Sequence, residues 1–131
     1  MSDKNIKVLL VDDEPDFTAP MTNWFQSKGY SVLVAATGER AIQMVKDDMP
    51  DIIFLDIYMP GMDGAQTLSK IREFNKTIPV IIISAYVDDQ RTREAAKHNI
   101  SGIFYKCKEF QEGLALLEST LKAHKQLKKK Q

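Results

Sequence analysis

The stretch Ile52-Ile53-Phe54-Leu55-Asp56 decides the fold, because four apolar residues run directly into one carboxylate. Short apolar runs rich in branched residues are typical of strands buried on both faces, as in parallel sheets covered by helices. Three further stretches repeat the pattern: Val8-Leu9-Leu10-Val11 before Asp12 and Asp13, Val80-Ile81-Ile82-Ile83 before Ser84, and Ile103-Phe104-Tyr105 before Lys106. The sequence therefore predicts a parallel sheet with polar residues at four strand ends.

Strand and helix signals alternate along the chain. Strands are expected near residues 7–11, 31–35, 52–56, 80–84 and 102–106. Apolar residues spaced three or four apart place amphipathic helices between and after them. The residues that mark these helices are Phe17, Met21, Trp24 and Phe25; Ala41, Ile42 and Val45; Ala65, Leu68, Ile71 and Phe74; Ala95 and Ala96; and Phe110, Leu114, Leu117 and Leu121. Five alternations predict an α/β fold, a single doubly wound (βα)5 domain with a five-stranded parallel sheet.

Composition favours one soluble domain without bulk attraction to nucleic acid or membrane. The chain has 131 residues, 44% of them hydrophobic, and its 18 basic residues balance its 18 acidic residues. Its one cysteine, Cys107, cannot form an internal disulfide, which fits a reducing compartment. The first five residues are polar, and no apolar stretch approaches the ~20 residues of a membrane span. We therefore expect a cytoplasmic protein with no membrane or nucleic-acid partner within this chain.

The lysines of the last ten residues raise the question of a basic patch. Lysines near a helix C-terminus suit the helix dipole, which favours a solvated helix end over a functional patch. We expect residues 1–121 to form the domain and residues 122–131 to form a lysine-rich tail at the end of the last helix.

The polar residues at the strand ends predict a site for phosphoryl transfer. Ligands of open α/β sheets bind beyond the carboxyl ends of the strands, where these side chains should meet. Asp56 stands alone after the third strand and is the best candidate nucleophile. Asp12 and Asp13 supply charge for a magnesium ion, which prefers a few carboxylates and several waters. Lys106 and Ser84 can contact phosphoryl oxygens as a point charge and a hydrogen-bond donor.

Each of these residues also has a simpler interpretation when taken alone. Asp12 and Asp13 precede a helix start and resemble a helix cap, and Asp56 could begin a turn. Ser84 could cap the fourth helix in competition with Asp88 and Asp89, and Lys106 could be a surface lysine. Compatible chemistry at four strand ends together favours a functional site.

Four stretches carry a resemblance to a known family. They are residues 8–14, which end in Asp12-Asp13-Glu14; Leu55-Asp56-Ile57-Tyr58-Met59-Pro60-Gly61-Met62-Asp63-Gly64; Ser84-Ala85; and Lys106. Over residues 6–121 the chain resembles the CheY-like receiver domains of two-component response regulators. The resemblance implies a flavodoxin-like sheet with the strand order 2-1-3-4-5.

The resemblance also implies a function. Asp56 would accept a phosphoryl group from the phosphohistidine of a sensor histidine kinase or phosphotransfer protein. Asp12, Asp13, Asp56 and the backbone carbonyl of Tyr58 would hold Mg2+. Ser84 and Lys106, expected at a solvent-facing pocket, would sense the phosphoryl group.

An unknown downstream protein would then bind a surface of the fourth helix, fifth strand and fifth helix. The fourth helix, expected over residues 88–99, has few large apolar side chains and should be weakly anchored. The chain would be a monomer or a phosphorylation-promoted dimer. It would be no enzyme beyond accepting and losing its own phosphoryl group.

Two positions depart from the family pattern. Cys107 follows the lysine where the family usually has a proline, often in a cis bond. A cis bond before a residue other than proline costs about 3 kcal/mol, so the Lys106–Cys107 bond should be trans. Ile103 stands where the family commonly has a switching aromatic residue; Tyr105 lies on the same strand face and either replaces that aromatic or simply fills space.

Three rival functions share parts of this pattern. A haloacid-dehalogenase phosphatase needs a second acidic residue two positions after its nucleophile, where this chain has Tyr58. A flavin-binding module needs a phosphate-cradling loop after its first strand, where this chain has three acidic residues. A pseudo-receiver that only docks to partners does not need the intact set of acidic, hydroxyl and lysine residues, and it remains the alternative.

Overall fold

Five strands and five helices alternate along the protein. A computed structural model describes residues 6–85 and 90–130, with side chains as far as residue 124. The elements are β1 (Lys7–Val11), α1 (Pro15–Ser27), β2 (Ser31–Ala35), α2 (Gly38–Asp47), β3 (Ile52–Asp56), α3 (Gly64–Phe74), β4 (Val80–Ser84), α4 (Gln90–Ala96), β5 (Gly102–Tyr105) and α5 (Phe110–Lys130). All five predicted strands are confirmed; β5 ends one residue earlier than expected.

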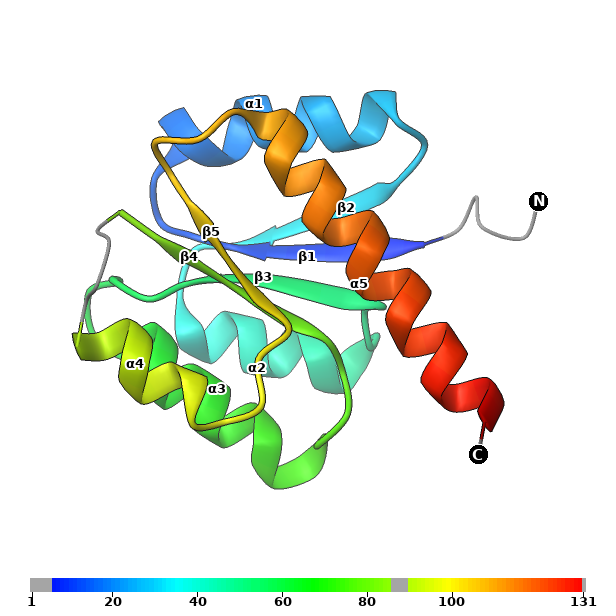
Figure 1. The fold of residues 1–131 in the computed structure, drawn as a ribbon. Helices are drawn as coiled ribbons and strands as arrows, with labels where there is room; N and C mark the ends of the chain where they lie inside the picture. The colour runs from blue at the N-terminus through cyan, green and yellow to red at the C-terminus, as the bar shows by residue number, and fades with distance from the viewer. Residues whose placement is uncertain (1–5, 86–89, 131) are drawn as a thin grey trace.

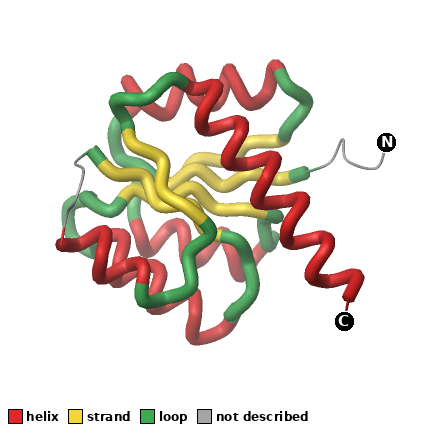
Figure 2. Tube along the Cα trace, viewed as in Figure 1, coloured by secondary structure: helices red, strands yellow, loops and turns green. Residues whose placement is uncertain are grey.

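The strands form one parallel sheet in the order β2-β1-β3-β4-β5. This confirms the doubly wound architecture and the strand order that the resemblance implied. Helices α1 and α5 cover one face, and α2, α3 and α4 cover the other, so that the sheet is the middle of three layers (Figures 1 and 2). The carboxyl ends of all five strands point to the left in Figure 1 and meet at one edge of the sheet.

The core has two parts, one on each face of the sheet. Every residue of β3 and β4 is buried, which explains why these strands are apolar throughout instead of alternating. On the face covered by α1 and α5, the ring of Phe54 lies 5.4 Å from that of Phe25. On the other face, Leu68 and Ile71 of α3 pack against strand residues that include Leu55. Both parts are fully buried, so the sheet that carries the strand ends is a rigid support.

Two expectations about the helices need correction. Phe74, predicted on the packed face of the third helix, is 43% exposed because it is the last residue of α3; the ammonium of Lys46 lies 5.1 Å from its ring centroid. The fourth helix was expected to reach residue 99 but ends at Ala96. Turn hydrogen bonds follow it, and Asn99 has a positive φ of 62°, which a helix does not allow. Asp88 and Asp89 lie outside the described residues.

The lysine-rich end of the chain prolongs the last helix. Helix α5 continues to Lys130 without interruption, and its final turns extend beyond the sheet (Figure 1). Within the described part of the chain, no helix combines the length and the apolar character that a membrane span requires.

Candidate metal and phosphoryl-acceptor site

The sheet brings the predicted site residues together at the carboxyl ends of its strands. Asp12 follows β1, Asp56 ends β3, Ser84 ends β4 and Lys106 follows β5. The backbone N–H of Lys106 donates to the carbonyl of Ser84 over 2.9 Å, which joins the ends of the last two strands. Because all five strands run parallel, residues far apart in sequence meet here.

Three carboxylates form a cluster at this edge. One ligand oxygen from each of Asp12, Asp13 and Asp56 lies within 4.8 Å of the others. Asp12 and Asp56 are 1% and 2% exposed, whereas Asp13 is exposed, so the cluster has a buried floor and an open side. Burial, together with the charge of Asp12, raises the pKa of Asp56 to about 7. Burial also raises the pKa of Asp12.

Lys106 supplies the positive charge of the cluster. Its Nζ lies 2.9 Å from Oδ2 of Asp12 and 3.5 Å from Oδ2 of Asp56, and it also pairs with the carboxylate of Glu14. Burial lowers the pKa of Lys106, but its contacts with the carboxylates of Glu14, Asp12 and Asp56 outweigh burial and raise it. The lysine is therefore an ammonium ion, held as a counter-ion to the carboxylates.

Glu14 is a residue of the site that the sequence did not predict. In the sequence it stands only as the last residue of the Asp12-Asp13-Glu14 motif. Its carboxylate is exposed on one side and binds the ammonium of Lys106, which is 92 residues away in sequence. Its position directly after two acidic residues at a strand end was the available signal, but the partner depends on where β5 lies.

The two oxygens of each buried carboxylate have different partners. Oδ1 of Asp12 accepts a hydrogen bond from the N–H of Glu14 (2.9 Å), and Oδ1 of Asp56 accepts one from the N–H of Tyr58 (3.1 Å). The remaining Oδ2 atoms both face Lys106. The backbone thus fixes the orientation of each carboxylate and leaves its Oδ2 atom facing the space between Asp12, Asp56 and Lys106.

These residues fit a divalent cation. Oδ2 of Asp12 is fully buried and accepts no hydrogen bond of good geometry, although Nζ of Lys106 is close. An acceptor without such a bond beside two further carboxylates is the kind of oxygen that Mg2+ binds. The helix-cap interpretation loses support, because residue 14 is the N-cap of α1 and no side chain caps that helix end.

The loop after β3 is built closely against Asp56. A methyl group on Gly64 would lie 2.3 Å from the carbonyl oxygen of Asp56, so only glycine fits. Asp63 and Gln66 form a reciprocal capping box that starts α3 at this point. The glycine and the cap explain why this part of the motif follows Asp56: they set the start of α3 against the end of β3.

Ser84 departs from the expected solvent-facing position. Its side chain is fully buried, because α4 packs over the end of β4 and Thr92 Oγ1 donates to Ser84 Oγ over 3.4 Å. Lys106 is also only 17% exposed. Arg91 of α4 lies 4.7 Å from the ring centroid of Tyr58. Helix α4 therefore contacts the site both at the hydroxyl of Ser84 and at the loop that follows Asp56.

The two departures from the family pattern have different outcomes. The Lys106–Cys107 bond is trans, as predicted. Ile103 and Tyr105 are both half-buried, and Ile103 packs against the core on the α2–α3 face. Whether Tyr105 acts as a switching aromatic stays a prediction.

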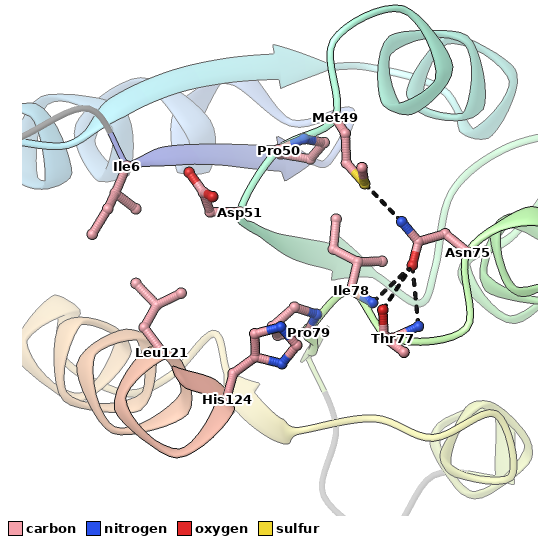
Figure 3. Close-up of a pocket in the computed structure, with 10 residues that line it drawn as sticks. All are labelled: Ile6, Met49, Pro50, Asp51, Asn75, Thr77, Ile78, Pro79, Leu121 and His124. Atoms are coloured by element: carbon pink, nitrogen blue, oxygen red, sulfur yellow. Dashed lines mark hydrogen bonds between the residues drawn. The ribbon is translucent and has the colours of Figure 1, made fainter. Parts of the chain in front are cut away.

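A hollow at the opposite end of the sheet does not share this chemistry. It has a volume of about 310 Å3 and lies between α5 and the loops that precede β3 and β4 (Figure 3). Asp51 on its wall accepts a hydrogen bond from the N–H of Lys7, and Asn75 binds the N–H groups of Thr77 and Ile78. None of the predicted site residues lines it, and these polar groups serve the loops.

Comparison with known proteins identifies the family of the chain. A family model described as the response regulator receiver domain matches residues 8–118. The chain is 32% identical over 121 residues to the transcriptional regulatory protein ZraR of Escherichia coli K12, which covers 92% of this chain but only 27% of that protein. It is 37% identical over 82 residues to sporulation initiation phosphotransferase F of Bacillus subtilis, covering 63% of this chain and 66% of that protein.

Solved structures show the same likeness. The receiver domain of the Francisella response regulator 1452 superposes with a TM-score of 0.81 at 28% identity, over 91% of this chain and 98% of that one. The family model spans most of the chain, and its limits enclose the acidic cluster, Ser84 and Lys106. The chain belongs to the response regulator receiver domains of two-component systems.

Proposed function

We propose that this receiver domain accepts a phosphoryl group on Asp56 from the phosphohistidine of a histidine kinase or phosphotransfer protein, in a magnesium-dependent reaction. The observation that carries the proposal is the acidic cluster with Lys106 between Asp12 and Asp56. The cluster would provide a nucleophile, a cation site and a positive charge close together, with the carboxylate oxygens within 4.8 Å of one another.

In the transfer, Oδ2 of Asp56 attacks phosphorus as the bond from phosphorus to the donor imidazole nitrogen breaks. Asp56 must be ionised to attack. Its pKa is raised to about 7, and a nearby cation would lower this pKa and so favour the ionised carboxylate. Mg2+ held by Asp12, Asp13, Asp56 and the Tyr58 carbonyl would neutralise charge on the phosphoryl oxygens. Lys106 moves its ammonium from Asp12 to a phosphoryl oxygen, and Ser84 donates its hydroxyl to another.

Phosphoryl transfer would also change the structure of the partner-binding surface. Ser84 cannot turn toward a phosphoryl oxygen without changing its contact with Thr92 of α4. A surface hollow of about 550 Å3 lies between β5 and α5, with Tyr105 and Leu116 in its wall. We propose that an unknown downstream protein reads the surface of α4, β5 and α5. Phosphorylation would shift a pre-existing equilibrium of this surface.

Three further features belong to the same proposal. The chain acts in the cytoplasm, binds sensor kinases or phosphotransfer proteins, and catalyses no reaction except on its own Asp56. The alternative, a pseudo-receiver that only docks, is disfavoured by the buried and mutually oriented carboxylates. Burying carboxylates costs free energy, and a domain that only docks would gain nothing in return for that cost.

Mass spectrometry tests the proposal. The protein is incubated with acetyl phosphate and Mg2+, and the added phosphate mass is measured. Asp56→Asn should remove the labelling, whereas Asp16→Asn, an exposed carboxylate near the same loop, should leave it unchanged. Labelling that persists in Asp56→Asn, or in the presence of a chelator, would contradict the assignment.

A further inference from the structure

Strand β2 forms an open edge of the sheet. Among the described residues β2 pairs only with β1, and the N–H of Ser31 and the carbonyl of Ala35 bond on that side, to Ile6 and Asp12, which flank β1. Backbone groups of a strand point alternately to its two sides. The N–H and C=O groups of Val32 and Val34 therefore point away from the sheet, and four hydrogen-bonding groups lie along this edge.

The edge lacks the usual protection against pairing. Natural edge strands are blunted by charged side chains, proline or a bulge. β2 consists of five uncharged residues without proline, and its one-to-one register with β1 contains no bulge. Leu33 and Val34 are each 42% exposed, on opposite faces of the strand. At the other edge, by contrast, every β5 side chain is at least half-buried.

We propose that β2 is a self-association edge, at which two copies of this chain pair antiparallel about a two-fold axis through Leu33. In this register Val32 of one copy faces Val34 of the second copy, and both pairs exchange N–H···O=C bonds. All four open groups are then satisfied. An axis through Val32 would pair Val34 with Tyr30, whose N–H already donates to Phe25, so fewer bonds could form.

The charge of the protein is compatible with a second copy as the partner. The formal net charge is +0 at pH 7, so two copies do not repel each other in bulk. No charged side chain stands within β2, so no like charges meet at the axis. Two five-residue strands bury less than a standard interface of about 1,600 Å2, so the dimer should be weak and reversible.

Cysteine crosslinking tests the register. In a Cys107→Ser background, Leu33→Cys places two thiols across the axis, at a Cα separation of about 4.5 Å that suits a disulfide. Met49→Cys is the control for random collision, since Met49 is more exposed (57%) but lies off the edge. With diamide as oxidant, the Leu33→Cys dimer should form about tenfold faster or more, because pairing raises the local thiol concentration.

Two further variants make the result decisive. Ser31→Cys, also exposed and on the same strand, faces Ala35 of the second copy and should not crosslink to itself. Val34→Lys should abolish concentration-dependent association in sedimentation equilibrium, whereas Met49→Lys should leave it unchanged; circular dichroism verifies folding. Equal rates for Leu33→Cys and Met49→Cys, rapid crosslinking of Ser31→Cys, or association that survives Val34→Lys would each overturn the proposal.

Discussion

Nζ of Lys106, the residue that follows β5, lies 2.9 Å from Oδ2 of Asp12, the residue that follows β1. The ammonium therefore lies inside the acidic cluster. The contact joins two residues that lie near opposite ends of the sequence of the domain. It also means that the ammonium stands where a divalent cation would share the same oxygens. Cation binding and lysine position are therefore coupled in this site.

Replacing Lys106 should strengthen metal binding and weaken signalling. In Lys106→Ala, no ammonium competes for Asp12 and Asp56, so the affinity for Mg2+ should rise about 3- to 10-fold. The structural response to beryllium trifluoride should be lost. Calorimetric titration measures the affinity, and Lys108→Ala, an exposed lysine in the same turn, is the control. If Lys106→Ala simply unfolds, the lysine is structural.

The raised pKa of Asp56 predicts a pH-dependent stability in the absence of metal. The folded protein binds the proton of Asp56 more tightly than the unfolded chain, since the pKa rises from 3.8 to about 7. The contribution of this group to stability is therefore present at low pH and declines as the pH rises through this interval.

Asp56→Asn removes the free-energy cost of holding an ionised Asp56 in the folded protein. With a chelator present, it should raise the free energy of unfolding at about pH 8 by about 1–3 kcal/mol, and the difference should fade toward about pH 4. Urea unfolding at several pH values measures the effect, and excess Mg2+ should narrow it. A stability difference that does not depend on pH would show that ionisation of Asp56 is not its cause.

The close contacts at Gly64 predict that an alanine there destabilises the protein much more than an alanine at Gly61, in the preceding loop. Gly64→Ala drives a methyl group into the backbone of Asp56 and Ile57, so it should cost about 2–4 kcal/mol and slow phosphorylation. Gly61→Ala meets no atom within 4 Å and only strains a positive φ, so it should cost about 1 kcal/mol. Thermal unfolding and acetyl phosphate labelling compare the two; equal effects would mean that the loop yields easily.

Arg72 is expected to be a main determinant of stability at the end of α4. Arg72 is 8% exposed, and its guanidinium donates to the carbonyls of His98, Asn75 and Asn99. Arg72→Ala removes these three hydrogen bonds and the packing of a buried side chain, and it should cost about 2–4 kcal/mol. Lys70→Ala, on the exposed side of α3, should change stability by less than about 0.5 kcal/mol in urea unfolding. A small effect of Arg72→Ala would mean that water replaces the guanidinium.

Hydrogen exchange tests how the site reaches the output surface. With beryllium trifluoride bound, amide exchange should change in α4, β5 and the first half of α5. Thr92→Val removes the hydroxyl that meets Ser84 and should reduce this change. Thr77→Val, at an exposed threonine distant from the site, is the control. Changes confined to the loop of Asp56 would refute this output face.

Several of these features could be read from the sequence. Strands β3 and β4 are buried on both faces, so each had to be a continuous apolar run, and such runs are visible without a structure. The polar residues that follow them, Asp56 and Ser84 among them, were predictable as site residues because parallel strands end at one edge. The strand order came from the family resemblance.

Only the tertiary structure decided how those residues are used. The partner of Glu14 is Lys106, and the burial of Ser84 depends on Thr92 of α4. Phe74 follows the apolar period of its helix yet is exposed, since α3 ends there. Local patterns report which face of an element is apolar, because that depends on near neighbours. Which charges meet, and which hydroxyl is covered, depends on the packing of elements that lie far apart in the chain.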